Sequence, residues 1–204
     1  MARVKTRKNA SAVDMTAMCD VAFLLLTFFI LTATAKQPEP LAVDTPASSV
    51  QTKLPDTDLA TITIGKGKVF FGVVGGDVRI KTLELMGEKY GVTFSENEKK
   101  RFSLIEGFGV PIEQLKSVIA MSNAERMEEG NQSSIPKDST NNQLADWIRS
   151  ARLANIEVAD QELKFAIKGD AKEQYPEIKQ IIDMLQAQKV NSFNLVTGMR
   201  GKDF

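Results

Sequence analysis

A single apolar run near the N-terminus constrains this chain more than any other feature of its sequence. Residues 15–35 read MTAMCDVAFLLLTFFILTATA, and Asp20 is the only charged residue among them. A helix rises about 1.5 Å per residue, so this stretch is long enough to span the ~30 Å hydrocarbon core of a bilayer. Residues 59–204 are enough for one further folded domain. The sequence therefore predicts one transmembrane helix over residues 15–35 and one domain outside the membrane.

The charges on either side of the run predict its orientation. Four basic residues precede it, namely Arg3, Lys5, Arg7 and Lys8. No acid occurs before Asp14. Only Lys36 follows the run directly. By the positive-inside rule, residues 1–14 stay in the cytoplasm and the C-terminal domain crosses the membrane. We therefore predict a single-pass inner-membrane protein with a cytoplasmic N-terminus and a periplasmic domain.

A cleavable signal peptide is the alternative interpretation of the same residues. Residues 21–31 form an apolar core between a basic segment and the small residues 33–35, as signal peptides do. The mature chain would then begin near Lys36 and act as a secreted binding protein. The acids Asp14 and Asp20 stand where signal peptides carry basic residues, which favours a retained helix. A membrane-tethered scaffold that moves no ion is the third interpretation.

Polar residues of the run fall on one face of the predicted helix. Positions seven apart nearly coincide in projection at 100° per residue. Thr27 follows Asp20 by seven residues, Thr34 follows Thr27 by seven, and Thr16 lies one turn before Asp20. A carboxylate near a bilayer centre costs about 2.5–3.5 kcal/mol, and removal from water favours its uncharged form. We predict that Asp20 translocates an ion, with Thr16, Thr27 and Thr34 as its supporting face; an acid that only snorkels to the interface is the alternative.

Composition argues against most other kinds of site. The chain has no histidine, and its one cysteine, Cys19, is predicted to be a small packed residue. A formal net charge of zero gives no support for a nucleic-acid partner. The Gly65-Lys66-Gly67 turn lacks the spacing of a phosphate-binding loop, and the glycines of residues 72–76 lack its following lysine and serine. The acids of residues 125–129 lack the ligand spacing of a calcium loop. We predict no enzyme activity, no cofactor and no metal site.

Residues 36–58 carry four prolines and predict an extended periplasmic linker, and the chain beyond it alternates between strand and helix patterns. Thr61 to Phe71 predict a hairpin around the glycines of the Gly65-Lys66-Gly67 turn. Helices are predicted at residues 95–105, from Pro111, at 142–155 and at 175–189, and strands at 163–167 and 193–196. Residues 123–140 are predicted to form a mobile loop, and Trp147 to pack in the core. The expected fold is a single N-terminal transmembrane helix followed by an α+β domain, a small sheet packed with helices.

The apolar run also resembles a known family. VDMTAMCDVAFLLLTFFILTA, residues 13–33, is similar to the membrane segment of the ExbD/TolR family, the ion-conducting subunits of TonB- and Tol-type energy transducers. That family has a short basic N-terminus, then two acids six residues apart that lead into a Leu- and Phe-rich helix. Asp14 and Asp20 match the two acids, so the resemblance places the family's essential membrane aspartate on Asp20. Ala17 departs from the pattern, because the family often has proline there.

The end of the chain resembles the same family. Residues 163–198 are similar to its strand–helix–strand ending. Asp170 matches the acid after the first strand, Tyr175 the tyrosine that opens the helix, and Val196-Thr197 the end of the last strand.

Two further segments are interpreted through this resemblance. Leu54-Pro55 resembles an element after the linker that can pair with a partner as an added strand. Residues 81–139 form a stretch longer than in the best-known members, which we interpret as a helical insertion in a periplasmic domain spanning residues 59–204.

The resemblance implies a motor subunit and its partners. It implies a polytopic ExbB- or TolQ-like ring around the helix, a TonB- or TolA-like transducer in the periplasm, a homodimer, and contact with membrane lipid. The implied function is to couple the proton-motive force to transport across the outer membrane.

Overall fold

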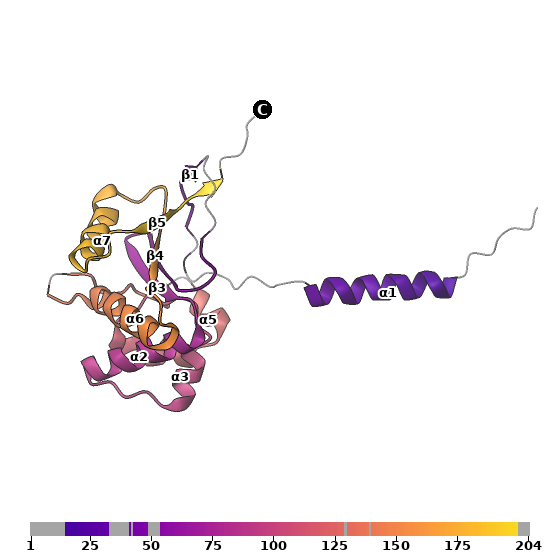
Figure 1. The fold of residues 1–204 in the computed structure, drawn as a ribbon, viewed down its shortest axis with the longest axis horizontal. Helices are drawn as coiled ribbons and strands as arrows, with labels where there is room; N and C mark the ends of the chain where they lie inside the picture. The colour runs from indigo at the N-terminus through magenta and orange to yellow at the C-terminus, as the bar shows by residue number, and fades with distance from the viewer. Residues whose placement is uncertain are drawn as a thin grey trace, which may run out of the picture. The chain divides into compact units, whose positions relative to one another are not determined.

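One apolar helix and one mixed α/β unit make up the computed structural model, which describes residues 15–32, 41, 43–48, 54–128, 130–138 and 140–199 (Figure 1). The chain divides into Met1–Gln37 and Pro38–Phe204. The first unit contains helix α1, Met15–Thr32. The second contains a small sheet with helices packed against it. The predicted fold class is therefore confirmed.

The main sheet has the strand order β3-β2-β4-β5. Its strands are β2 Leu59–Gly65, β3 Lys68–Val73, β4 Lys164–Gly169 and β5 Phe193–Val196. β2 pairs antiparallel with β3 and parallel with β4, and β4 pairs parallel with β5. The predicted hairpin is confirmed: Lys66 and Gly67 both have positive φ, which suits a two-residue turn between twisted strands.

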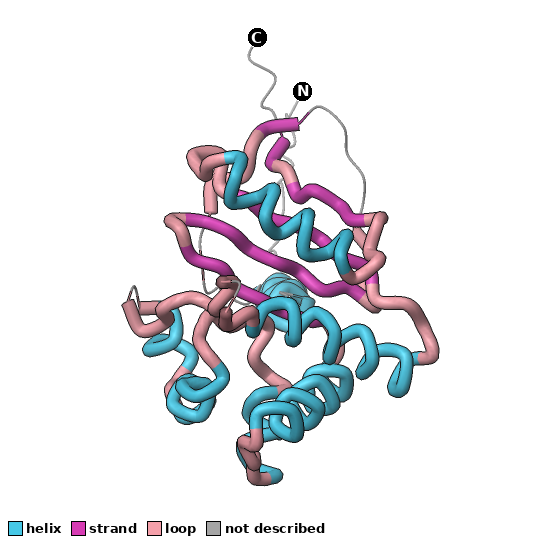
Figure 2. The backbone as a smooth tube through the Cα atoms, turned by 90° about the vertical axis from the view of Figure 1, so that its left-hand side faces the viewer, coloured by secondary structure: helices cyan, strands magenta, loops and turns pink. Residues whose placement is uncertain are grey.

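The helices of the second unit lie in front of this sheet and beyond its β3 edge (Figure 2). They are α2 Gly76–Tyr90, α3 Glu96–Phe102, α4 Leu115–Ala120, α5 Asn123–Met127, α6 Gln143–Ala159 and α7 Tyr175–Ala187, with a 3₁₀ turn at Ile112–Gln114. Because side chains alternate along a strand, Ile62 and Ile64 point into this core and are fully buried. Thr61 and Thr63 lie on the opposite face and are half-buried.

Trp147 lies at the centre of the core, as predicted. Its side chain is fully buried and contacts the rings of Phe102 and Phe108, with centroids 6.3 and 4.7 Å away. Phe108 in turn meets Phe71 of β3 edge-on. These rings join α3, α6 and the sheet into one apolar cluster.

Helix α2 was not predicted. It contains Gly76 and Gly87, and glycine weakens a helix by about 1 kcal/mol relative to alanine. Packing outweighs this cost, because Val78, Leu83 and Met86 are buried on one side of the helix. The helix predicted for residues 95–105 ends three residues earlier, at Phe102, and the one predicted from Pro111 begins as the 3₁₀ turn.

The prediction of a mobile loop at residues 123–140 is wrong. The segment begins with helix α5, and Gln132 and Ile135 are buried. The Val69 amide donates to the Ser134 hydroxyl at 3.0 Å, and the Ile135 amide donates to the Val69 carbonyl at 3.0 Å. Polar side chains that resemble loop residues in the sequence thus attach this segment to the free edge of β3.

Part of the predicted linker is paired with the domain. Strand β1, Ala47–Ser48, pairs in parallel with β6, Gly198–Met199. The Ala171 amide donates to the Asp44 carbonyl at 2.7 Å. This part of the linker is therefore joined to the segment after β4 and to the last described residues of the chain.

A membrane helix with a single carboxyl as the candidate functional site

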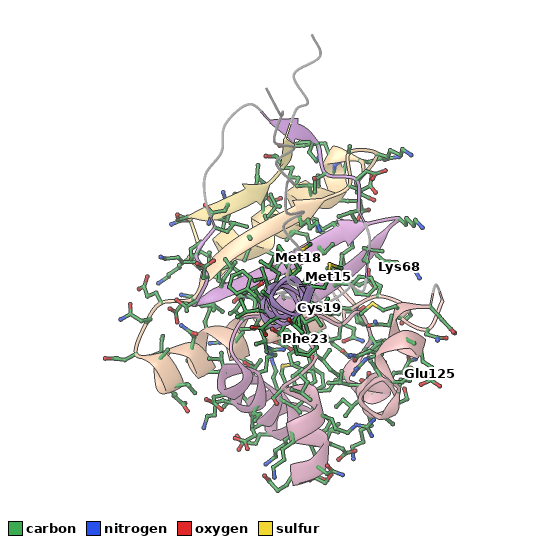
Figure 3. All side chains as sticks on the ribbon, turned by 90° about the vertical axis from the view of Figure 1, so that its right-hand side faces the viewer. Met15, Met18, Cys19, Phe23, Lys68 and Glu125 are labelled. Atoms are coloured by element: carbon green, nitrogen blue, oxygen red, sulfur yellow. The ribbon has the colours of Figure 1, made fainter. Side chains whose placement is uncertain are left out.

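Helix α1 is apolar on all sides. Its large apolar side chains are 48–85 % exposed. Figure 3 views the helix nearly end-on and shows Met15, Met18, Cys19 and Phe23 radiating from it. Such a surface requires lipid or partner helices around it. At 18 residues the helix is roughly 27 Å long, close to the thickness of a hydrocarbon core.

Within the described residues, α1 is the one helix with the length and composition to cross a membrane. A signal sequence near an N-terminus meets the same criterion. The distinction between a membrane helix and a signal sequence therefore depends on the polar side chains of α1.

Asp20 is the one charged side chain of this helix. It is the sixth residue, roughly 7.5 Å along the axis from Met15. Its carboxylate is exposed, and no hydrogen bond or ion pair joins it to another described residue. An unpaired carboxylate in a bilayer is costly, so its environment must come from water or from another chain.

Thr27 shares the face of Asp20. The two positions are about 20° apart around the helix axis. Thr16, one turn before Asp20, is about 40° from it around the same axis. The Thr27 hydroxyl donates to the Leu24 carbonyl at 2.9 Å, which satisfies its proton within the helix. Its oxygen can still accept a hydrogen bond from a neighbour.

Thr32 shows that this local hydrogen bond is not special to the Asp20 face. Its hydroxyl donates to the Phe28 carbonyl at 2.8 Å, yet it lies about 120° from Asp20. Asp14 and Thr34, two of the predicted polar positions, lie outside the described residues.

The other predicted site residues belong to the second unit. Asp170 follows β4, where its carboxylate accepts from the Lys172 amide at 2.9 Å and its own amide donates to the Ile64 carbonyl. Tyr175 is the first residue of α7 and is 70 % exposed. Leu54 and Pro55 are half-buried and lie outside any strand. Asp170 therefore stabilises a turn, and Tyr175 is available at the surface.

The described residues contain no group of three or more His, Cys, Asp or Glu side chains that could hold a metal ion. Cys19 is an exposed free cysteine of α1, and its predicted role as a small packed residue stays a prediction. Asp20 is thus the chemically distinctive group of the membrane helix.

Comparison with protein families places this helix in context. The family model described as biopolymer transport protein ExbD/TolR matches residues 6–199, which include α1 and nearly all of the second unit. This chain belongs to the ExbD/TolR family. The match also runs through residues 81–139, the stretch interpreted as an insertion. No curated protein matches the chain, and no solved structure does.

Membership of the ExbD/TolR family determines the general class of function. ExbD/TolR proteins are energy-coupling subunits of biopolymer transport systems of the TonB and Tol type, and are not known enzymes. They are anchored in the inner membrane by an N-terminal helix, the position of α1 here. They work with ExbB/TolQ-type and TonB/TolA-type partners.

Proposed function

We propose that Asp20 is the proton carrier of an ion-driven motor that couples the proton-motive force to transport across the outer membrane. The observation that carries this proposal is the unpaired carboxylate on an otherwise uncharged apolar helix. A permanent charge there would have to be compensated by a partner. A carboxyl that gains and loses a proton alternates between a form that lipid tolerates and a form that it does not.

This alternation can move the helix. When Asp20 is neutral, α1 can face lipid or the apolar wall of a surrounding ring of ExbB/TolQ-type subunits. When it is ionised, the helix is drawn to a polar position of the ring. One elementary charge that crosses ~100 mV releases about 2.3 kcal/mol, so a few protons in series bias such steps strongly.

The proposal includes a topology. Arg3, Lys5, Arg7 and Lys8 precede the helix, and a basic flank favours the cytoplasmic side. Asp20 lies in the N-terminal third of α1 and therefore near the cytoplasmic side. The second unit lies in the periplasm, where it can contact a TonB/TolA-type transducer and a second copy of itself.

Motion of α1 reaches the second unit through the linker. That segment contains β1, whose pairing with β6 joins it to the domain. Leu54 and Pro55 follow β1 in the same linker and lie outside any strand. We propose that they pair with a partner strand as the contact with the second copy. Asp170, directly after β4, and Tyr175, the first residue of α7, lie on the same domain.

Replacement of Asp20 by asparagine tests the proposal. Asp20→Asn keeps the size of the side chain but cannot ionise. We expect loss of energised transport in cells, with unchanged co-purification of the ring partner. Cys19→Ala, one residue away and about 100° around the helix, is the matched control and should transport normally.

Three outcomes would contradict the proposal. Full transport by Asp20→Asn would indicate a tethered scaffold. Loss of transport by Cys19→Ala as well would indicate helix packing instead of proton chemistry. An intact mass that lacks the first 35 residues would indicate a cleaved signal peptide.

A further inference from the structure

The face of the sheet opposite the helices has a pocket of about 280 Å³. Thr61 and Thr63 of β2 form part of its floor, with Phe70 of β3 beside them. Leu41 and Val74 add apolar surface. Most of the accessible lining is therefore apolar, with a few polar groups among it, as in pockets that bind small molecules.

One wall of the pocket is held in place by the backbone. The Phe71 and Phe108 amides and carbonyls exchange two hydrogen bonds, at 2.8 and 3.0 Å. The segment of Glu106 and Gly107 is thereby pressed against Gly72, where a methyl group would stand 2.1 Å from the Glu106 carbonyl oxygen. This wall cannot retreat without breaking the pairing with β3.

Arg79 lies at the same end of the pocket. Its guanidinium donates to the Ile105 carbonyl at 2.7 Å and to the Gly75 carbonyl at 3.3 Å, so two backbone groups fix its position. Burial lowers the pKa of this guanidinium, while the Glu106 carboxylate opposes that shift. A partly desolvated cation attracts an anion more strongly than one in water does.

The remaining polar groups also suit an anion. Lys168 of β4 and Glu106 also line the pocket. The hydroxyls of Thr61 and Thr63 make no hydrogen bond within the described part of the chain, so both can donate to a ligand. The pocket thus combines a fixed guanidinium with two hydroxyl donors and apolar walls.

We propose that this pocket binds a small carboxylate with a short apolar tail, the carboxylate against Arg79 and the tail over Phe70 and Leu41. A guanidinium can pair with a carboxylate through two parallel hydrogen bonds, which gives both affinity and orientation. The site is separate from Asp20 and does not depend on the motor function. It would let a small soluble carboxylate bind to the second unit.

Trp147 provides the means to measure binding. It is the only tryptophan of the chain. It lines a small cavity whose other walls include Phe71, Val73 and Arg79, which also line the pocket. A ligand that contacts Arg79 therefore changes the surroundings of a residue next to the indole.

The experiment titrates the full chain in lipid nanodiscs with 4-methylpentanoate and, separately, with its uncharged amide. Trp147 fluorescence is the readout, and a Trp147→Phe protein gives the background. We expect a saturable change with the carboxylate at millimolar concentration, and at least tenfold weaker binding of the amide. Equal binding of the two, or no saturable change, would overturn the proposal.

Variants test the role of each charge. Arg79→Gln should weaken carboxylate binding at least tenfold, and Glu106→Gln should strengthen it about threefold because it removes a like charge. Glu88→Gln, an exposed position of α2 outside the pocket, is the control and should have no effect. If Arg79→Gln does not fold, Glu106→Gln and Thr63→Val decide: unchanged affinity in both would overturn the proposal.

Discussion

The backbone of Gly109 lies directly against the ring of Phe70. A methyl group on Gly109 would stand 2.5 Å from Phe70 Cδ1, well inside the contact distance of two carbon atoms. This closeness lets the segment after α3 cover β3, and it leaves no room for a side chain at residue 109.

Gly109→Ala should therefore destabilise the second unit. Overpacking costs about 1–3 kcal/mol, because Phe70 or the backbone has to shift. Urea unfolding of the full chain in detergent, followed by Trp147 fluorescence, measures this loss. Gly76→Ala is the matched control: its nearest neighbour would be 3.6 Å away, and it starts a helix, so stability should be unchanged or slightly higher. Equal effects of the two changes would contradict the packing argument.

Gln132→Leu should also destabilise this unit. The Gln132 side chain is buried, accepts from the Gly109 amide at 2.7 Å and donates to the Arg126 carbonyl at 3.1 Å. Leucine would leave that buried amide unpaired, at a cost of about 1–3 kcal/mol. We expect a lower urea midpoint and faster hydrogen exchange at Gly109. Gln161→Leu, at an exposed position, should change neither.

Thr27→Val should reduce energised transport, whereas Thr32→Val should not. Both hydroxyls donate to a backbone carbonyl of α1, so loss of that bond should affect the helix about equally in the two variants. Of these two threonines, only Thr27 lies on the face of Asp20. We expect a decrease of about three- to tenfold in transport rate for Thr27→Val, roughly the effect of losing one hydrogen bond of 0.5–1.5 kcal/mol. Equal rates in the two variants would mean that the threonine face has no part in ion movement.

Acid should remove the contribution of Glu98 to the cap of helix α3. Hydrogen bonds from the Ser95 amide and hydroxyl to the Glu98 carboxylate lower the pKa of that carboxyl below its ordinary value of 4.5. Because the folded pKa is the lower one, the ionised form stabilises the fold above pH 4.5, and this contribution is lost as the pH falls through the folded pKa.

Glu98→Gln measures that contribution. At pH 7 the variant should be less stable by under about 1 kcal/mol, because interactions of solvent-exposed charges contribute at most about 1 kcal/mol. The difference from the unchanged protein should disappear once the pH is below the lowered folded pKa of Glu98, where both side chains are neutral. Glu162→Gln, an exposed loop position, should show no such pH-dependent difference. A difference in stability that does not shrink as the pH falls below 4.5 would contradict the role of charge in this cap.

Local patterns were sufficient to predict α1 and much of the second unit. The apolar run of α1, the glycines of the β2–β3 turn and the Ser95–Glu98 capping box each act within a few residues. The two ends of the domain, the hairpin and the pair β4–α7, were therefore predicted near their observed positions.

Features that depend on distant contacts were missed. Helix α2 is stabilised by packing against α6, which outweighs the weak helix propensity of Gly87. Gln132 and Ser134 resemble loop residues until Gly109 and Val69 are placed beside them. The pocket at Arg79 combines residues from both ends of the domain, so no local pattern could predict it.

The parallel pairing of β2 with β4 has a consequence for how the second unit folds. Leu59 lies opposite Lys164, so about a hundred residues must be ordered or looped out before the two strands meet. The hairpin β2–β3 can form early, since its strands are joined by two residues. Strand β2 would then be paired with β3 alone while the helices between β3 and β4 fold. The newly made domain is thus most vulnerable to unwanted strand pairing and proteolysis in the interval before β4 arrives.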